Sequence, residues 1–252
     1  MKNILPILFA LLPSSLSFSQ NRATPDTIAT NKGELIIQPI IHGTLVLSWN
    51  GHTIYVDPYG GAERFDGLKD PSLILITDIH GDHLNQKTLD ALDIGRAQFI
   101  VPKAVREKLP EEMKKRAAVI DNGQTIVFEE VEILGIPMYN LPETEDSRHP
   151  KGRGNGYVLT LGDKRLYISG DTEDIPEMRN LKNIDVAFVC MNLPYTMDIE
   201  QAASAVKAFK PAIVYPFHYR GKGGLSDVES FKQRVESVDV STEVRLRNWY
   251  PD

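Results

Sequence analysis

Short apolar runs separated by polar turns dominate the first part of the chain and predict β-strands. The runs cover residues 35–41, 44–49 and 53–56. Asn50 and Gly51, between the last two runs, are a strong two-residue signal for a tight hairpin. The pattern therefore predicts an antiparallel meander near the start of the folded domain.

From residue 73 onward, predicted strands alternate with predicted helices. Strands are expected at 73–76, 98–101, 117–120, 125–128, 131–138, 157–161, 165–169, 185–191, 212–215 and 244–246, and helices at 85–93, 103–116, 199–209 and 227–238. The helix at 199–209 has a clear apolar face, because its apolar residues recur every three to four positions. This alternation in both halves of the chain predicts an α/β fold in which two sheets pack together with helices outside.

A dense cluster of metal-binding side chains follows the strand at 73–76. Asp78, His80 and Asp82 stand at alternate positions. His83 breaks the alternation, so it can approach a common point from another angle. Carboxylates and imidazoles at this density suit Zn²⁺ or a similar divalent ion. The alternative is a polar surface turn with two chance histidines, but the whole chain has only six histidines.

Three further candidates stand at or near strand ends. Asp171 and His218 each come just after a predicted strand, and His149 lies in the long loop 139–156. Each has an ordinary alternative: a turn aspartate, a packed structural histidine and a solvated loop histidine. The loop is rich in proline, glycine and charged residues, so we expect its order to come from outside, for example from a metal.

Four basic residues are candidates for substrate binding. Arg148, Lys151 and Arg153 lie in the long loop, and Arg220 follows the predicted strand at 212–215. The three loop residues are interpreted equally well as solvated surface residues or as ligands of a substrate phosphate or carboxylate, which a guanidinium group can hold at two points.

The composition limits the possible functions. The chain of 252 residues suits one large domain or two similar halves. A formal charge of −6 and the absence of any long segment rich in lysine and arginine argue against a nucleic-acid partner. No apolar stretch is long enough to span a bilayer. Cys190 is the only cysteine, so no disulfide forms within the chain, and we expect it to be a small buried residue.

The N-terminus has the features of a bacterial signal peptide over residues 1–19. Lys2 gives a positive start, residues 4–12 form a short apolar core, and Ser17 and Ser19 place small side chains at the positions that a signal peptidase recognises. We therefore expect export to the periplasm or out of the cell. The polar segment 20–32 is expected to be a mobile leader, and 33–252 to be one folded domain.

The stretch at 78–83 resembles the HxHxDH signature of the metallo-β-lactamase superfamily, with Asp78 in place of the first histidine. The segments around Asp171 and His218 extend the resemblance over nearly all of the chain after the signal peptide. It implies a four-layer αβ/βα sandwich. The phrases HPKGRGNGYVL, SGDTEDIPEM and MNLPYTM are more similar to the ascorbate-6-phosphate-lactonase-like branch of metal-dependent hydrolases than to antibiotic-cleaving β-lactamases.

The resemblance also implies a centre with two divalent metal ions. The first ion would be bound by Asp78, His80 and His149, and the second by Asp82, His83 and His218, with Asp171 between them. Asp57, a turn residue on its sequence context alone, would support the metal-binding loop without ligating. Zinc is the expected metal, but the carboxylate of Asp78 would shift the first site toward Mn²⁺ or Fe²⁺ or weaken it.

The function implied is that of an exported metal-dependent hydrolase. A metal-bound hydroxide would attack an ester, lactone or phosphodiester of a small anionic substrate, with Asp82 as the proton shuttle. A periplasmic β-lactamase and a non-catalytic metal- or ligand-binding protein of the same fold are the alternatives. No feature of the sequence defines an oligomeric state.

Overall fold

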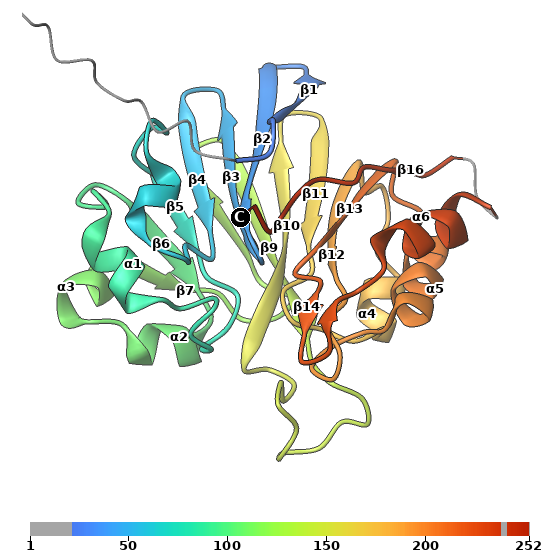
Figure 1. Cartoon of the computed structure of the whole chain (residues 1–252). Coiled ribbons are helices and arrows are strands. Elements are labelled where there is room, and N and C mark those ends of the chain that lie inside the picture. The colour runs from blue at the N-terminus through green and yellow to red at the C-terminus, as the bar shows by residue number, and fades with distance from the viewer. Residues whose placement is uncertain (1–21, 238–240, 252) are drawn as a thin grey trace, which may run out of the picture.

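Two seven-stranded β-sheets pack face to face in the computed structural model, which describes residues 22–237 and 241–251. Helices cover the outer faces, so the layers run helices, sheet, sheet, helices (Figure 1). The expected four-layer α/β sandwich is therefore confirmed. The expected signal peptide at 1–19 lies outside the described residues.

The N-terminal half forms the first sheet. Its strands, in spatial order, are β1 (Asp26–Thr30), β2 (Gly33–Ile41), β3 (Thr44–Trp49), β4 (His52–Val56), β5 (Leu73–Leu75), β6 (Gln98–Val101) and β7 (Ala117–Val119). Strands β1 to β4 are antiparallel, with the predicted hairpin between β3 and β4, and β4 to β7 are parallel. A short 3₁₀-helix, Ala62–Phe65, lies between β4 and β5.

The C-terminal half repeats this plan in the second sheet. Its strands, in chain order, are β8 (Thr125–Phe128), β9 (Val131–Met138), β10 (Gly154–Leu161), β11 (Lys164–Ile168), β12 (Val186–Cys190), β13 (Ile213–Phe217) and β16 (Glu243–Val244). Strands β8 to β11 are antiparallel, and β11, β12, β13 and β16 are parallel. A small hairpin of β14 (Arg220–Gly221) and β15 (Gly224–Leu225) stands apart from the sheet.

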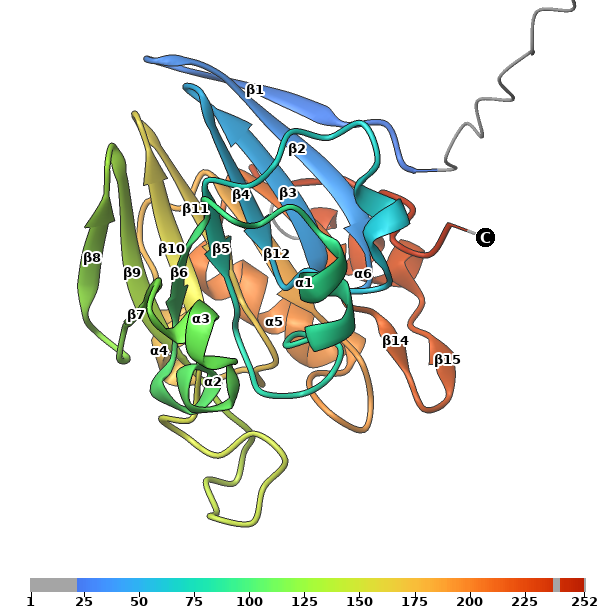
Figure 2. The same ribbon diagram turned by 90° about the vertical axis from the view of Figure 1, so that its left-hand side faces the viewer.

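Helices from each half cover that half's own sheet. The first sheet carries α1 (Gln86–Ala91), α2 (Lys103–Lys108) and α3 (Glu111–Lys114) beside its parallel strands (Figure 2). The second carries α4 (Pro176–Arg179), α5 (Ile199–Phe209) and α6 (Val228–Glu236). Because the helices cover the outer faces of the parallel strands, the central strands β5 and β12 are buried on both sides. No helix in the described part of the chain is long and apolar enough to cross a membrane.

The main core fills the space between the sheets and joins them at the edge where the parallel strands end. Tyr157 of β10 is fully buried, and its hydroxyl donates a 2.7 Å hydrogen bond to the carbonyl of Ile76, just after β5. The amide of Asn155 donates to the carbonyl of Thr77 at 3.0 Å. Cys190 is buried in this core, as expected.

The segment expected to be a mobile leader contains a strand. Residues 26–30 form β1, which pairs with β2 along its whole length. The hydroxyl of Tyr215, from the second sheet, donates to Asp26 at 2.9 Å. The polar composition of the segment suggested disorder, but its order comes from pairing with an already formed strand and not from its own apolar content.

Candidate metal centre

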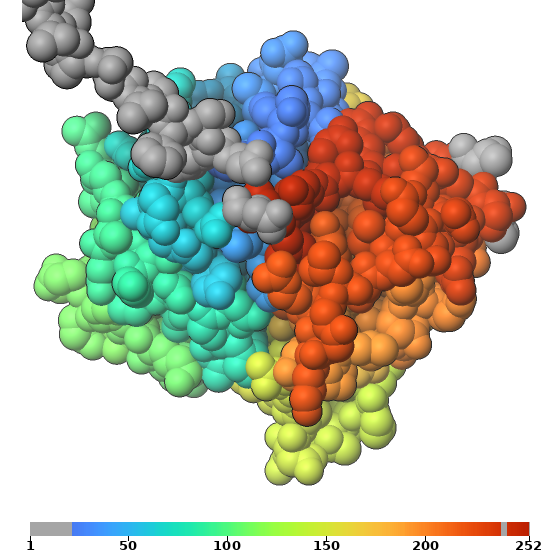
Figure 3. All heavy atoms as spheres, viewed as in Figure 1, coloured from blue at the N-terminus to red at the C-terminus, as the bar shows by residue number. Residues whose placement is uncertain are grey.

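All seven expected metal ligands meet at one edge of the two sheets. They are Asp78, His80, Asp82 and His83 after β5, His149 before β10, Asp171 after β11 and His218 after β13. Parallel strands of a sheet end at the same edge, which brings distant segments together. The loop 139–153 and the hairpin of β14 and β15 project from this edge (Figure 3).

Asp78, His80 and His149 form the first group of candidate ligands. One atom of each lies within 4.8 Å of the others. Asp78 Oδ2 is 2.5 Å from His80 Nδ1 and 4.0 Å from His149 Nε2. The side chains of Asp78 and His149 are fully buried, whereas that of His80 is 24% exposed. The group is therefore reached from solvent on the His80 side.

His83, Asp171 and His218 form the second group, again with one atom of each within 4.8 Å of the others. The Nε2 atoms of His83 and His218 lie 3.2 and 3.3 Å from the carboxylate of Asp171. Asp82 lies beside this group, with Oδ2 3.5 Å from His218 Nε2 and a side chain that is 33% exposed. Asp82 is thus the carboxylate of the centre that a substrate can reach most easily.

Asp171 connects the two groups. Its Oδ2 lies 3.2 Å from His149 Nε2 in the first group and 3.2 Å from His83 Nε2 in the second. The preceding Gly170 has a φ of 60°, and a Cβ there would lie 2.6 Å from Met138 Sδ. Only glycine fits this turn, which carries Asp171 from the end of β11 into the centre.

The unpaired atoms of the centre fit bound cations. His149 Nε2 and Asp171 Oδ1 are buried without a hydrogen-bond partner in the described part of the chain. His80 Nδ1 also makes no hydrogen bond, although Asp78 Oδ2 is only 2.5 Å away. These nitrogen and oxygen atoms lie close together but do not have the geometry of hydrogen bonds. Their lone pairs are therefore free for a cation placed between them. Nitrogen and oxygen donors arranged in this way suit divalent metal ions.

Asp57 orients His83 by contacting the ring nitrogen that faces away from the other candidate ligands. Its Oδ2 lies 2.8 Å from His83 Nδ1 and accepts the Thr77 hydroxyl at 2.6 Å, and its Oδ1 accepts the Thr77 amide at 2.7 Å. The contact fixes the proton of the neutral imidazole on Nδ1 and leaves Nε2 facing Asp171. Asp57 itself belongs to neither group of candidate ligands.

Asn140 holds His149 in the same manner, and sequence reasoning missed it. Its Oδ1 accepts the His149 amide at 2.8 Å and lies 3.1 Å from His149 Nδ1. Its Nδ2 donates to the carbonyl of Tyr195 at 2.8 Å and to Glu173 at 3.1 Å. Hydrogen bonds of Asn140 therefore hold the two ends of the loop 139–153 together. The composition of the loop had suggested that a metal would be needed to order it.

His42 also belongs to the centre. Its Nε2 is 3.1 Å from Asp82 Oδ2, its Nδ1 is 2.7 Å from the hydroxyl of Tyr250, and its ring lies 3.7 Å from that of His218. A lone histidine after a strand gives no signal of this placement, which depends on the turn between β2 and β3 packing against β13.

The charges of the second group stabilise one another in the metal-free protein. Burial alone would lower the pKa of His83, but the carboxylates of Asp171 and Asp57 hold that pKa well above its ordinary value. Burial would raise the pKa of Asp171, but His218 and His83 hold it well below its ordinary value. A metal ion bound here would take the place of the proton on His83, so binding would be coupled to proton release.

Two of the four candidate substrate-binding cations already have carboxylate partners. Lys151 Nζ lies 3.3 Å from Glu143 and 3.2 Å from Glu177. Arg153 makes two contacts with Asp78, at 3.2 and 3.1 Å. These two side chains are therefore engaged within the protein.

The other two cations lie on tyrosine rings. The guanidinium of Arg148 is 4.5 Å from the ring centre of Tyr195, and that of Arg220 is 4.2 Å from the ring centre of Tyr250. Both arginines are exposed, and neither is in a salt bridge within the described residues. Each guanidinium lies over a tyrosine ring, and this cation–π contact does not use its N–H groups.

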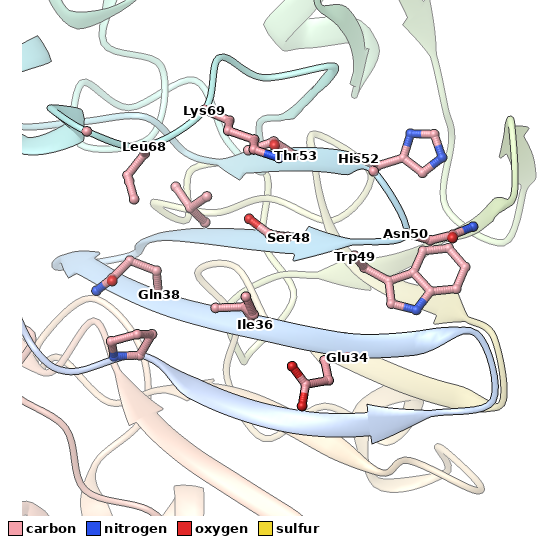
Figure 4. Close-up of a pocket in the computed structure, with 14 residues that line it drawn as sticks. Glu34, Ile36, Gln38, Ser48, Trp49, Asn50, His52, Thr53, Leu68 and Lys69 are labelled. Carbon is pink, nitrogen blue, oxygen red and sulfur yellow. The ribbon is translucent and has the colours of Figure 1, made fainter.

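A hollow on the outer face of the first sheet is unrelated to this centre. It lies over β2, β3 and β4, where no helix covers the sheet, and is lined by side chains that include Ile36, Ser48 and Thr53 (Figure 4). None of the candidate metal ligands lines it.

Known proteins share both the sequence and the fold. A family model described as a beta-lactamase superfamily domain matches residues 37–218. A protein named as a UPF0173 metal-dependent hydrolase from Pyrococcus horikoshii is 31% identical over 195 residues, covering 72% of this chain and 84% of that protein. A similarly named protein from Aeropyrum pernix is 29% identical over 229 residues, covering 81% of this chain and 91% of that protein.

Two solved structures extend the comparison. A proposed metal-dependent hydrolase from Parabacteroides distasonis has a TM-score of 0.80 and 38% identity, covering 90% of this chain and 100% of that one. A metallo hydrolase from Ignicoccus hospitalis has a TM-score of 0.70 and 27% identity, covering 84% and 94%. Since the family model spans most of the chain and the fold agrees, the protein belongs to the metallo-β-lactamase superfamily.

Proposed function

We propose that the protein is a metal-dependent hydrolase of a small anionic ester, lactone or phosphodiester. The observation that carries the proposal is the pair of histidine and aspartate groups joined by Asp171. The names of its relatives from Pyrococcus horikoshii and Aeropyrum pernix support hydrolysis. A ligand-binding protein without activity would not need an accessible carboxylate such as Asp82 beside the second group.

Two divalent ions, with zinc as the first choice and Mn²⁺ or Fe²⁺ as alternatives, would supply a Lewis acid and an activated water. Asp171 would hold the two groups at a fixed separation. Asp82, which lies 3.1 Å from His42 Nε2 and is partly exposed, would accept the proton of the attacking water and deliver it to the leaving oxygen.

Arg148 and Arg220 would bind the anionic part of the substrate. Each lies within two residues of a candidate ligand, His149 or His218, and Arg220 lies over Tyr250, whose hydroxyl contacts His42. Lys151 and Arg153 are less suitable, because carboxylates already hold them. Lactones are the first substrates to test, because the sequence resembles the ascorbate-6-phosphate-lactonase-like branch.

Hydrolysis of a substrate panel tests the proposal. Protein loaded with Zn²⁺ or Mn²⁺ is assayed with lactones, esters and phosphodiesters, each with and without a phosphate or carboxylate group, and with nitrocefin. We expect turnover of an anionic member, little of nitrocefin, and loss of turnover in Asp171→Asn. Turnover of nitrocefin alone would favour the β-lactamase alternative. Binding of panel members without any turnover would favour the non-catalytic alternative.

Arginine variants test the recognition of the anion. Removing a charge-assisted contact costs about 1.5–3 kcal/mol, so Arg148→Gln and Arg220→Gln should each lower kcat/KM for the anionic substrate about 10- to 100-fold. Neutral substrates should be affected much less. Arg96→Gln, an exposed arginine after α1, is the matched control. Equal losses for anionic and neutral substrates would contradict the assigned role.

We also propose export, which rests on the signal-peptide features of residues 1–19. Cell fractionation and N-terminal sequencing of the purified protein test it. A mature chain that begins at Gln20 in the periplasm or medium is expected, and a cytoplasmic chain that retains residue 1 would contradict it.

A further inference from the structure

Arg153 and Asp78 form a tightly held ion pair inside the first group. Arg153 Nε donates to Asp78 Oδ1 at 3.2 Å, and its Nη2 donates to Asp78 Oδ2 at 3.1 Å. Nη2 also donates to the carbonyl of Arg148 at 2.6 Å. The side chain of Asp78 is fully buried and that of Arg153 is 20% exposed. Two parallel hydrogen bonds to one carboxylate give a strong and directional contact.

The ion pair of Arg153 and Asp78 forms because the start of β10 packs against the end of β5. The amide of Asn155 donates to the carbonyl of Thr77 at 3.0 Å. A Cβ at Gly154 would lie 2.8 Å from that carbonyl and 2.4 Å from Met138 Cε. Glycine at 154 is therefore required for the close approach that places Arg153 beside Asp78.

The rest of the Asp78 carboxylate faces the first group. Its Oδ2 lies 2.5 Å from His80 Nδ1 and 4.0 Å from His149 Nε2, and neither contact is a hydrogen bond. Oδ1 thus contacts Arg153, whereas Oδ2 contacts Arg153 and also faces the position shared with the two histidines. The pair as a whole carries no net charge, like a neutral imidazole.

We propose that Arg153 is a built-in counter-ion that allows Asp78 to replace a neutral histidine as a ligand of the first metal ion. Arg153 acts as a positioning residue: it neutralises the extra charge of the aspartate and fixes the carboxylate with Oδ2 toward the metal position. It is therefore part of the metal centre and does not contact the substrate. The two positions depend on each other, so a histidine at 78 requires an uncharged side chain at 153.

Two double variants that differ in charge at position 153 test this dependence. Asp78→His is combined with Arg153→Met in one protein and with Arg153→Lys in the other, because methionine and lysine are similar in length and flexibility. A positive charge close to a divalent ion is strongly repulsive at low dielectric. Bound metal is measured after dialysis against a fixed concentration of free Zn²⁺, and circular dichroism checks the fold.

We expect about two zinc ions per chain in the parent and in Asp78→His/Arg153→Met, but about one in Asp78→His/Arg153→Lys, whose first site should bind at least about tenfold more weakly. Equal metal content in the two double variants would overturn the proposal, and so would a single ion in the parent. The proposal rests on the metal centre of the proposed function, but its readout is bound metal. A failure of hydrolysis is therefore distinguishable from a failure here.

A single substitution gives a second, independent readout if the double variants fold poorly. Arg153→Met leaves the buried Asp78 without its counter-ion, so the metal-free protein should melt below the parent. Added Zn²⁺ takes over the neutralisation and should raise Tm more in this variant than in the parent. Arg153→Lys, which keeps the charge, should melt close to the parent. Equal melting of metal-free Arg153→Met and parent would overturn the proposal.

Discussion

A histidine presents one defined nitrogen to a metal when a neighbour holds the other nitrogen. His83 faces Asp57 through Nδ1, and His149 faces Asn140 through Nδ1. Each contact leaves Nε2 directed toward Asp171. At the scale of single residues, the supporting side chains therefore decide how the candidate ligands meet the metal.

Replacement of Asp57 by asparagine tests this support. Asparagine keeps the size of the side chain but can donate as well as accept, so it no longer fixes the proton of His83 on Nδ1. Outer partners of metal-binding histidines typically contribute 10- to 100-fold to affinity, so we expect a loss of about this size for the second group. A Zn²⁺ titration against a competing chelator measures it. Asp93→Asn, at an exposed position after α1, is the control, and an unchanged affinity in Asp57→Asn would contradict the role.

The candidate ligands could be predicted from the sequence, but most of their partners could not. Four donors in six residues after one apolar strand stand out at 78–83. Asn140 and His42 have no such local pattern. Asn140 contacts His149 only because the loop 139–153 folds back on itself, and His42 reaches Asp82 only through the packing of two separate turns.

At the scale of elements, the turn between β2 and β3 and the end of β13 fit closely together. His42 and His218 both have positive φ, at 56° and 48°, and the amide of His218 donates to the carbonyl of His42 at 3.0 Å. A Cβ on Gly43 would lie 2.9 Å from His218 Cδ2. The turn thus sets the position of the His218 ring.

A methyl group at position 43 should displace His218. Overpacking of this kind destabilises by about 1–3 kcal/mol, and the ring can relieve the clash by rotating out of the centre. We therefore expect Gly43→Ala to lose the metal of the second group while the circular dichroism spectrum is retained. Gly81→Ala is the matched control, because it also lies in the centre but a Cβ there has no neighbour within 4 Å. Equal metal content in the two variants would show that Gly43 does not position the ligand.

The elements with strong apolar patterns agree with the sequence, whereas an edge strand does not. The helix expected at 199–209 is α5 with the same bounds, and Pro110 separates α2 from α3 in the stretch 103–116. Strand β1 was missed because its sequence, DTIAT, has little apolar content. Its stability comes from the pairing with β2 and from Tyr215 in the other sheet, and neither is visible in a local pattern.

At the scale of the whole molecule, the centre joins the two halves of the sandwich. Asp78, His80, Asp82 and His83 come from the first half of the chain, and His149, Asp171 and His218 come from the second. Protein contacts already link the halves at this edge: Tyr157 and Asn155 donate to carbonyls after β5, Arg153 pairs with Asp78, and the amide of His218 donates to the carbonyl of His42. A metal ion held by ligands from both halves would therefore act as a further link between them.

Metal removal should for this reason lower stability as well as activity. A ligand that binds only the folded state stabilises it by about 2.7 kcal/mol at 100 times its Kd. In a domain of this size, each kcal/mol shifts Tm by about 2–4 °C, so chelation and dialysis should lower Tm by roughly 5–10 °C, and Zn²⁺ should restore it. Asp171→Asn has lost the charge that connects the two groups, so its Tm should respond much less. If the parent and this variant respond equally, the metal does not link the halves through Asp171, and the stabilisation must come from ligands within one half.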